Sequence, residues 1–226
     1  MRHPTSAIIL SLVAAASHAN SIPTGLPDMD ARQKVHAIVV ADLAAGADLP
    51  PFEECRKRDV ICMHEPYWFR ADILAVVSGS VPEMRLNVVT AGHQGVAAFV
   101  RGDPMPRLLE VFTQGDAATM PTYASRPLAR RRDGELFLID RGYGWPDWLP
   151  CATQALRETV DVKAFSTDLH VDPDEFDMPH ITEHRDLYDV TKDGMYPRFG
   201  VAVSRLRELL ASLKSSGAAT DCRRPS

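Results

Sequence analysis

The sequence lacks several features that would assign it to a common functional class. After residue 19, no apolar run approaches the roughly eighteen residues that a membrane-spanning helix needs. Acidic residues outnumber basic ones by 30 to 25, for a net charge of −5, whereas nucleic-acid-binding proteins usually present a basic surface. With 45% hydrophobic and 24% charged residues, the composition excludes a disordered chain. We therefore expect a soluble globular protein that binds no nucleic acid.

The first nineteen residues have the pattern of a secretory signal peptide. Arg2 supplies a positive charge, residues 7–16 are apolar apart from one serine, and residues 17–19 (Ser-His-Ala) form a small-x-small cleavage site. Ten apolar residues are about half of what a membrane span needs. We expect cleavage after Ala19, a polar lead-in over 20–33, and a mature protein that is periplasmic or secreted, without membrane insertion.

All four cysteines lie after the predicted cleavage site, which indicates disulfides. An even number in an exported chain predicts two bonds, and four cysteines allow three connectivities. We favour Cys55–Cys62, which flanks a charged turn, and Cys151–Cys222, which would tie the polar C-terminal tail to the body of the protein. Zinc is the alternative, but spacings of six and 70 intervening residues match no common closed zinc site.

Residues 34–149 are predicted to form a small antiparallel β-barrel, with an OB-like barrel as one candidate. The segments alternate apolar and polar residues with a period of two, are rich in β-branched and aromatic residues, and are joined at glycine, proline or aspartate. No long helical pattern separates them, which disfavours a doubly wound sheet. The predicted strands cover residues 35–41, 60–63, 67–77, 84–91, 96–101, 108–113 and 135–140.

Residues 150–226 are predicted to form an extension with helices that packs on the barrel. We expect a short helix over 150–160 and an acidic, irregular stretch over 161–197. From Phe199 to Leu213, apolar residues recur with the helical period, and Gly217 is a natural end. A membrane-surface helix is the alternative, although such a helix usually carries more lysine and arginine.

One short motif resembles a zinc-peptidase signature. His180-Ile-Thr-Glu183-His184 fits the pattern H-x-x-E-H of the inverted zinc peptidases. That resemblance implies two histidine ligands one helical turn apart, with Glu183 as general base and a glutamate further along as third ligand. Only Glu208 follows, on a helix whose apolar face is needed for the core. We therefore expect no zinc and no other cofactor.

Other catalytic patterns are incomplete as well. No G-x-S-x-G motif occurs, and the acidic stretch 172–177 lacks the glycine and terminal glutamate of a calcium loop. A serine, histidine and aspartate site assembled in space, for instance from His93 or His170, stays open. An envelope hydrolase with such a site is the alternative function.

The predicted binding residues lie in one strand and one loop. Trp68 and Arg70 make the start of strand 67–77 polar and aromatic on its second face, and residues 141–148 place three aromatics beside two glycines. A loop that only covers the end of the core is the alternative for residues 141–148. For the arginines of 129–133 we expect a hairpin turn with solvated charge, and contact with an anionic ligand or partner is the alternative. We predict a non-catalytic binding or interaction protein of the cell envelope, with a protein or oligosaccharide as ligand. Its predicted contacts are Trp68, Arg70, Arg141, Tyr143, Trp145, Asp147 and Trp148.

Overall fold

The structure is a computed structural model of the chain. It describes residues 35–48, 65–92, 105–114, 117–121, 124–139, 145–146, 148–171, 185–192 and 194–216. The predicted signal peptide, the polar lead-in, and the predicted strands 60–63 and 96–101 lie outside these residues. None of the helices in the described ranges is both long and apolar enough to cross a membrane.

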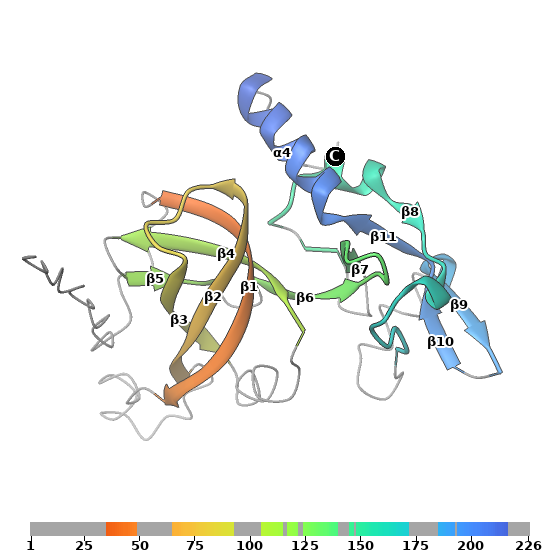
Figure 1. The fold of residues 1–226 in the computed structure, drawn as a ribbon, viewed down its shortest axis with the longest axis horizontal. Helices are drawn as coiled ribbons and strands as arrows, with labels where there is room; N and C mark the ends of the chain where they lie inside the picture. Colours follow the sequence, from red (N-terminus) through yellow and green to blue (C-terminus); the bar gives the residue numbers. More distant parts are fainter. Residues whose placement is uncertain are drawn as a thin grey trace, which may run out of the picture.

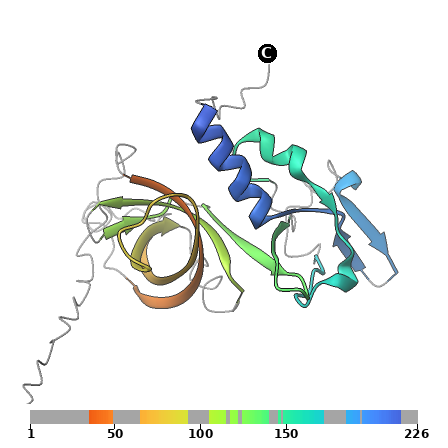
Figure 2. The same cartoon turned by 45° about the horizontal axis from the view of Figure 1, so that its top comes forward.

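A closed five-stranded barrel forms the N-terminal part of the fold, as predicted (Figures 1 and 2). Its strands are β1 (Val35–Asp48), β2 (Glu65–Gly79), β3 (Arg85–Gly92), β4 (Arg107–Gln114) and β5 (Ala117–Thr119). They follow the order β1-β2-β3-β5-β4, and β4 closes the barrel by pairing with β1. All neighbouring pairs are antiparallel except β3 and β5, which run parallel. The finer assignment of an OB-like barrel stays a prediction.

A second sheet continues from the barrel through β6 (Ser125–Arg130). The first half of β6 pairs with β4 and its second half with β7 (Leu136–Ile139). Next in the sheet come β11 (Phe199–Ala202) and β8 (Glu158–Thr159). Strands from both sides of the predicted boundary at residue 149 therefore belong to one continuous sheet. The remaining elements are η1 (Cys151–Leu156), η2 (Val162–Ala164), η3 (Arg185–Leu187), β9 (Tyr188–Thr191), β10 (Gly194–Pro197) and α4 (Val203–Ser216).

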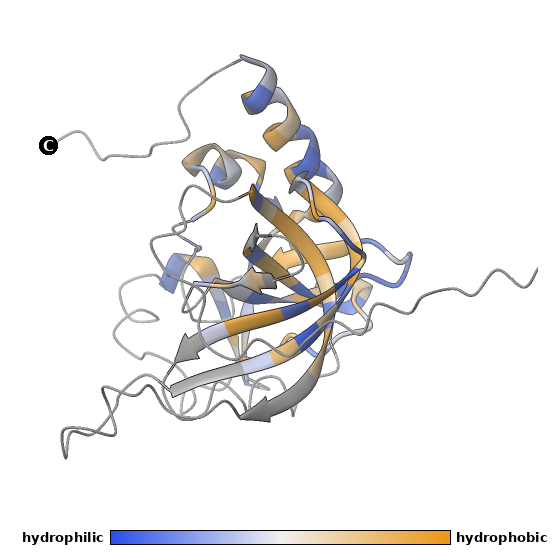
Figure 3. Cartoon of the chain, turned by 90° about the vertical axis from the view of Figure 1, so that its left-hand side faces the viewer, coloured by the Kyte–Doolittle hydropathy of each residue, from blue (hydrophilic) through white to orange (hydrophobic). Residues whose placement is uncertain are grey.

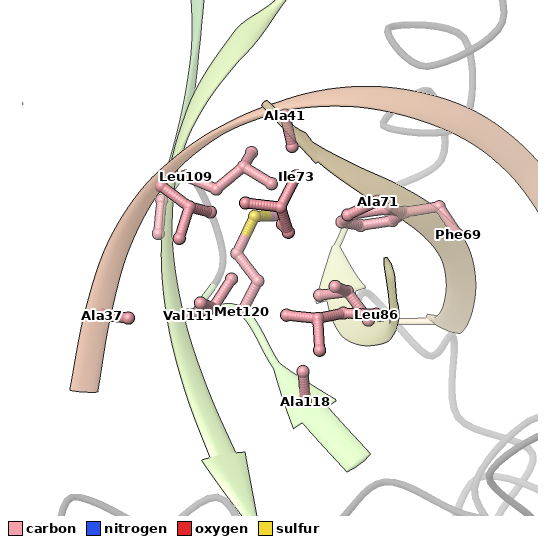
Figure 4. Close-up of a cluster of buried hydrophobic side chains, with 13 residues drawn as sticks. Ala37, Ala41, Phe69, Ala71, Ile73, Leu86, Leu109, Val111, Ala118 and Met120 are labelled. Carbon is pink, nitrogen blue, oxygen red and sulfur yellow. The ribbon is translucent and has the colours of Figure 1, made fainter. Parts of the chain in front are cut away.

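The barrel interior is filled by side chains of alternating strand positions (Figure 4). On β1 these are the small residues Ala37, Val39 and Ala41, which leave room for Phe69 and Met120 from other strands. Small and large residues together fill the narrow space inside a barrel of five strands. The interior is therefore a packed core.

Two bulges in β2 change which residues face this core. The register against β1 shifts between Ile38 and Val39 and again between Val40 and Ala41, so Val77 and Leu74 each lack a partner of their own. The alternation predicted one shared face from Tyr67 to Val77. That expectation was wrong at its end, because each bulge reverses the alternation beyond it. Val77 instead packs in the cluster beneath α4.

Helix α4 packs between the barrel and the second sheet. Its buried residues Val203, Leu206 and Leu210 lie in one cluster with Ile38 and Val40, from the outer face of β1. Figure 3 shows hydrophobic and hydrophilic segments alternating along its turns, as expected of a helix with one buried face. The predicted docking of the C-terminal helix on the barrel is confirmed.

The predicted start of this helix at Phe199 was wrong. Phe199–Ala202 form β11, which pairs with β7 and β8. A Cβ atom on Gly200 would lie 3.1 Å from Ile139 and 3.3 Å from Phe137, so the glycine lets the strand pack closely there. Tertiary pairing thus converts four residues with an apolar helical pattern into a strand.

Two further expectations for the C-terminal part were wrong in part: the short helix expected over 150–160 is present as η1 but ends at Leu156, and the following stretch contains a hairpin. Residues 150–160 form the short η1 and then β8, because the residues after Leu156 pair with β11 instead of continuing a helix. The stretch 161–197 is not irregular throughout, since β9 and β10 form an antiparallel hairpin. The short length and polar exposed side of this hairpin hid it from the sequence pattern.

Candidate functional site

The outer face of β1, β2 and β3 carries a group of polar and aromatic side chains. Strand residues alternate between faces, so the interior positions of Phe69 and its neighbours on β2 turn Trp68, Arg70 and Asp72 outward. The register places Asp72 between Asp42 of β1 and Arg85 of β3. We name this group the tryptophan–arginine face and define it as Asp42, Trp68, Arg70, Asp72 and Arg85.

Asp72 holds the two arginines of this face. The Nε atom of Arg85 donates a hydrogen bond of 2.6 Å to Oδ1 of Asp72, and the Nε atom of Arg70 lies 3.4 Å from Oδ2. The hydrogen bond from Arg85 is the main cause that lowers the pKa of Asp72. Partial burial opposes it, and the charges of Arg85 and Arg70 lower this pKa further. The carboxylate is therefore ionised at neutral pH, and each guanidinium is positioned through its Nε atom.

The face is open to solvent on β2 and at Arg85, whereas Val89 and Asn87 of β3, which lie opposite Trp68 and Arg70, are buried. The side chains of Arg70, Asp72 and Arg85 are 47%, 37% and 65% exposed, Asp42 is exposed and Trp68 is half-buried. Neither arginine makes a further polar contact through its Nη groups to a described residue. An incoming ligand can therefore meet the aromatic ring of Trp68 at one end of the face and the two guanidinium groups held by Asp72 at the other.

Trp145, predicted as a binding residue, makes several contacts within the protein. Its Nε1 atom donates a 2.9 Å hydrogen bond to Oγ1 of the buried Thr153, and the Arg157 guanidinium lies 5.1 Å from its ring centroid. The ring packs against the cluster beneath α4. These contacts give Trp145 a packing role, and its predicted contact with a ligand stays a prediction.

Trp148 is also packed within the protein. It contacts both the barrel interior and the cluster beneath α4, and its buried Nε1 atom has no hydrogen-bond partner among the described residues. Trp68 is a member of neither cluster, so the structure does not bring it together with Trp145 and Trp148. The other predicted loop contacts, Arg141 and Asp147 together with Tyr143, lie outside the described residues.

The arginine-rich turn after β6 is a hairpin turn with internal partners, as predicted. The Nε and Nη2 atoms of Arg131 lie 2.8 and 2.6 Å from Oδ2 of Asp133, and its guanidinium lies over Phe137. The hydrogen bond from Arg131 lowers the pKa of Asp133. Arg132 donates through Nε to the carbonyl of Lys163. The two guanidinium groups thus already have partners.

A small cleft beside this turn is too small for a drug-sized ligand. Its volume is about 120 Å³, and its walls include Phe137, Phe165 and Glu158. Pockets for drug-sized ligands usually measure about 300–1,000 Å³. We therefore assign no site to it.

The described residues do not assemble a metal site. Among them, no three side chains of histidine, cysteine, aspartate or glutamate come together in a way that could hold an ion. His36 lies on the barrel with Nε2 2.9 Å from Oε1 of Glu110, whereas His170 packs on Tyr196 beside the β9–β10 hairpin. His64 and His93, like His180 with Glu183 and His184, lie outside the described residues, so the hydrolase alternative stays a prediction.

Cys151 is the one cysteine in the described part of the chain. It lies exposed at the start of η1 and carries no free thiol. Cys55, Cys62 and Cys222 lie outside the described residues. The pairs Cys55–Cys62 and Cys151–Cys222 stay predictions.

Sequence reasoning missed three residues of the tryptophan–arginine face, Asp72 on the same strand and Asp42 and Arg85 on its neighbours. Trp68 and Arg70 were found because polar residues interrupt an otherwise apolar strand, but Asp42 and Arg85 come from other strands. Only the register, with Asp42 and Arg85 on either side of Asp72, shows that they belong to the same face. The polar positions within residues 35–48 and 84–91 were the available signal.

Comparison with models of known protein families, with curated proteins and with solved structures finds no match to this chain.

Proposed function

We propose that this chain is an exported, non-catalytic binding protein of the cell envelope that contacts its ligand through the tryptophan–arginine face. One observation carries the proposal: the half-buried Trp68 and the exposed Arg70 occupy successive outward positions of β2, and Asp72 at the next outward position holds the guanidinium groups of Arg70 and Arg85. Tryptophan and arginine are the residue types most enriched at the energetic centres of binding surfaces. The fixed geometry of the arginines reduces the entropy that they lose on binding.

The position of this face in the fold supports the proposal. OB-like barrels bind oligosaccharides or oligonucleotides on the face of their second and third strands, which is fold-level analogy. Helix α4 covers a different part of the barrel, where Ile38 and Val40 are buried beneath it. The described residues of α4 therefore do not cover Trp68, Arg70 or Arg85.

The proposal is tested by comparing two surface variants in a binding assay. Trp68→Ala removes the aromatic ring of the face, and Val190→Ala, at a 77% exposed position on β9, is the matched control. Immobilised wild-type protein and Val190→Ala should retain the same component of an envelope extract. Trp68→Ala should lose it while its melting temperature stays close to that of the control. Equal retention by all three proteins would refute the assigned face.

Export is part of the same proposal and has its own test. Mass spectrometry of the exported protein should find a chain that begins at Asn20. A retained N-terminus, or a protein extracted only by detergent, would contradict it.

The two predicted disulfides complete the proposal. Closing the loop between Cys151 and Cys222 constrains the unfolded chain by about 4 kcal/mol in the entropic model, more than the short loop between Cys55 and Cys62. Cys222→Ser should therefore lower the melting temperature more than Cys55→Ser. Free thiols in the unfolded, unreduced protein would contradict both bonds.

A further inference from the structure

We infer that the ligand of the tryptophan–arginine face is an uncharged oligosaccharide. This inference rests on the proposed function and adds the chemical class of the ligand. It follows from the hydrogen-bonding groups of the face, from their balance of charge and from the dimensions of the face.

The hydrogen-bonding groups of the face match sugar hydroxyls. A hydroxyl both donates and accepts hydrogen bonds, a carboxylate only accepts them, and a guanidinium only donates them. Asp42, Asp72 and Arg85 lie next to one another in a single row across three strands, and Arg70 follows on the next outward position of β2. Neighbouring hydroxyls of a sugar can therefore donate to a carboxylate and accept from a guanidinium at the same time.

The balance of charge disfavours an anionic ligand. Two carboxylates, Asp42 and Asp72, oppose two guanidinium groups, Arg70 and Arg85, so the face carries no net charge, while the whole chain carries −5. An acidic saccharide or an oligonucleotide would meet a negatively charged protein and would have to compete with Asp72 for the same arginines. An uncharged saccharide is not repelled by the net negative charge of the protein and does not compete with Asp72 for the arginines.

The dimensions of the face favour a chain of sugars over a single sugar. Trp68 and Asp72 are four residues apart on β2, which is about 14 Å at about 3.4 Å per residue. In the row of Asp72 the face spans three adjacent strands, about 10 Å at about 4.8 Å per strand spacing, whereas beside Trp68 the facing Val89 of β3 is buried. Its aromatic end can stack on the apolar face of one sugar ring, and its polar end can bond the hydroxyls of the following units.

Binding to three classes of probe of similar length tests the inference. The probes are neutral glucose and mannose hexasaccharides, a hexamer of uronic acids and a single-stranded DNA hexamer, each titrated at 50 and 300 mM NaCl. We expect a neutral hexasaccharide to bind with a change of less than twofold between the two salt concentrations, because no net charge is neutralised. Trp68→Ala should weaken this binding at least tenfold.

A charge variant separates the neutral class from the acidic class. Asp72→Asn gives the face a net positive charge and releases both arginines. The matched control is Asp189→Asn, because Asp189 is an exposed aspartate of β9 that pairs with Arg198. We expect Asp72→Asn to weaken the neutral saccharide at least threefold and to strengthen the uronate hexamer, with no change in the control.

The outcomes distinguish the inference from the proposed function. Tighter binding of the uronate or DNA hexamer to the wild type, with strong salt dependence, overturns the inference and leaves the binding face standing. No binding of any probe, together with Trp68-dependent retention of an envelope component, overturns the saccharide class. No binding of any probe and no Trp68-dependent retention overturn both.

Discussion

The replacement of Leu206 by alanine measures how much the docking of α4 contributes to the stability of the barrel. Leu206 is fully buried at the centre of the cluster that joins α4 to Ile38 and Val40 of β1. Because this cluster links the C-terminal helix to the outer face of the barrel, the barrel and the helix should unfold together. Leu206→Ala should therefore destabilise the whole protein and not only its last turns.

The expected loss is about 3 kcal/mol. Leucine to alanine removes three carbon atoms, which is about 2.4 kcal/mol at about 0.8 kcal/mol per buried methylene. Each 40 Å³ of void that stays open adds about 1 kcal/mol. For a protein of this size, a loss of about 3 kcal/mol lowers the melting temperature by about 6–12 °C.

Urea and thermal unfolding, each followed by circular dichroism and by tryptophan fluorescence, measure the effect. Arg205→Ala is the control, because Arg205 is exposed on the same helix and its replacement should change the free energy of unfolding by less than about 0.5 kcal/mol. A melting temperature for Leu206→Ala within 2 °C of the control would refute the docking argument. That result would instead favour the alternative of a helix whose apolar face contacts something other than the barrel, such as a membrane surface.

Three further predictions follow from particular contacts. Gly79 has a φ of +78° and a Cβ atom there would lie 2.1 Å from the carbonyl oxygen of His36, so Gly79→Ala should lower the melting temperature clearly more than Gly134→Ala, where φ is +96° but no atom lies within 4 Å. Trp145→Phe should cost about 1 kcal/mol in chemical unfolding for its lost hydrogen bond, and Trp145→Ala about 3 kcal/mol; an unchanged stability in both would remove its packing role. The pKa of Asp72 is lowered in the folded state, so the stabilisation by its carboxylate should be present above pH about 4 and vanish as the pH falls through the folded pKa, and the stability difference between wild type and Asp72→Asn should close over that range. A difference that persists at lower pH would contradict this account.

The sequence predicted the barrel because its strands satisfy local rules one at a time. The alternation in residues 84–91 and 108–113 is strong enough to define β3 and β4 nearly as the structure has them, and that in residues 35–41 defines the first half of β1. The helix around Leu206 was predicted for the same reason, since its apolar period is long. Segments of this kind can be predicted from their local apolar pattern alone, and the tertiary structure forms the same elements.

Short elements could not be predicted because their stability comes from neighbours distant in the sequence. Phe199–Ala202 fits a helical pattern as well as a strand pattern, and only pairing with β7 and β8 decides between them. The two bulges of β2 are likewise invisible in the sequence. They arise where the strand bends to close the barrel, and they turn Val77 from the interior toward α4.

The candidate site shows the same division. The sequence by itself determined that Trp68 and Arg70 lie on a second, polar face of a strand, because alternation within one strand is a local property. Only the tertiary structure decided that Asp42 and Arg85 join them and that Asp72 holds the two arginines. The physical reason is that strand register is set by the closing of the whole barrel and by its packed interior, and neither of these is encoded in any single segment.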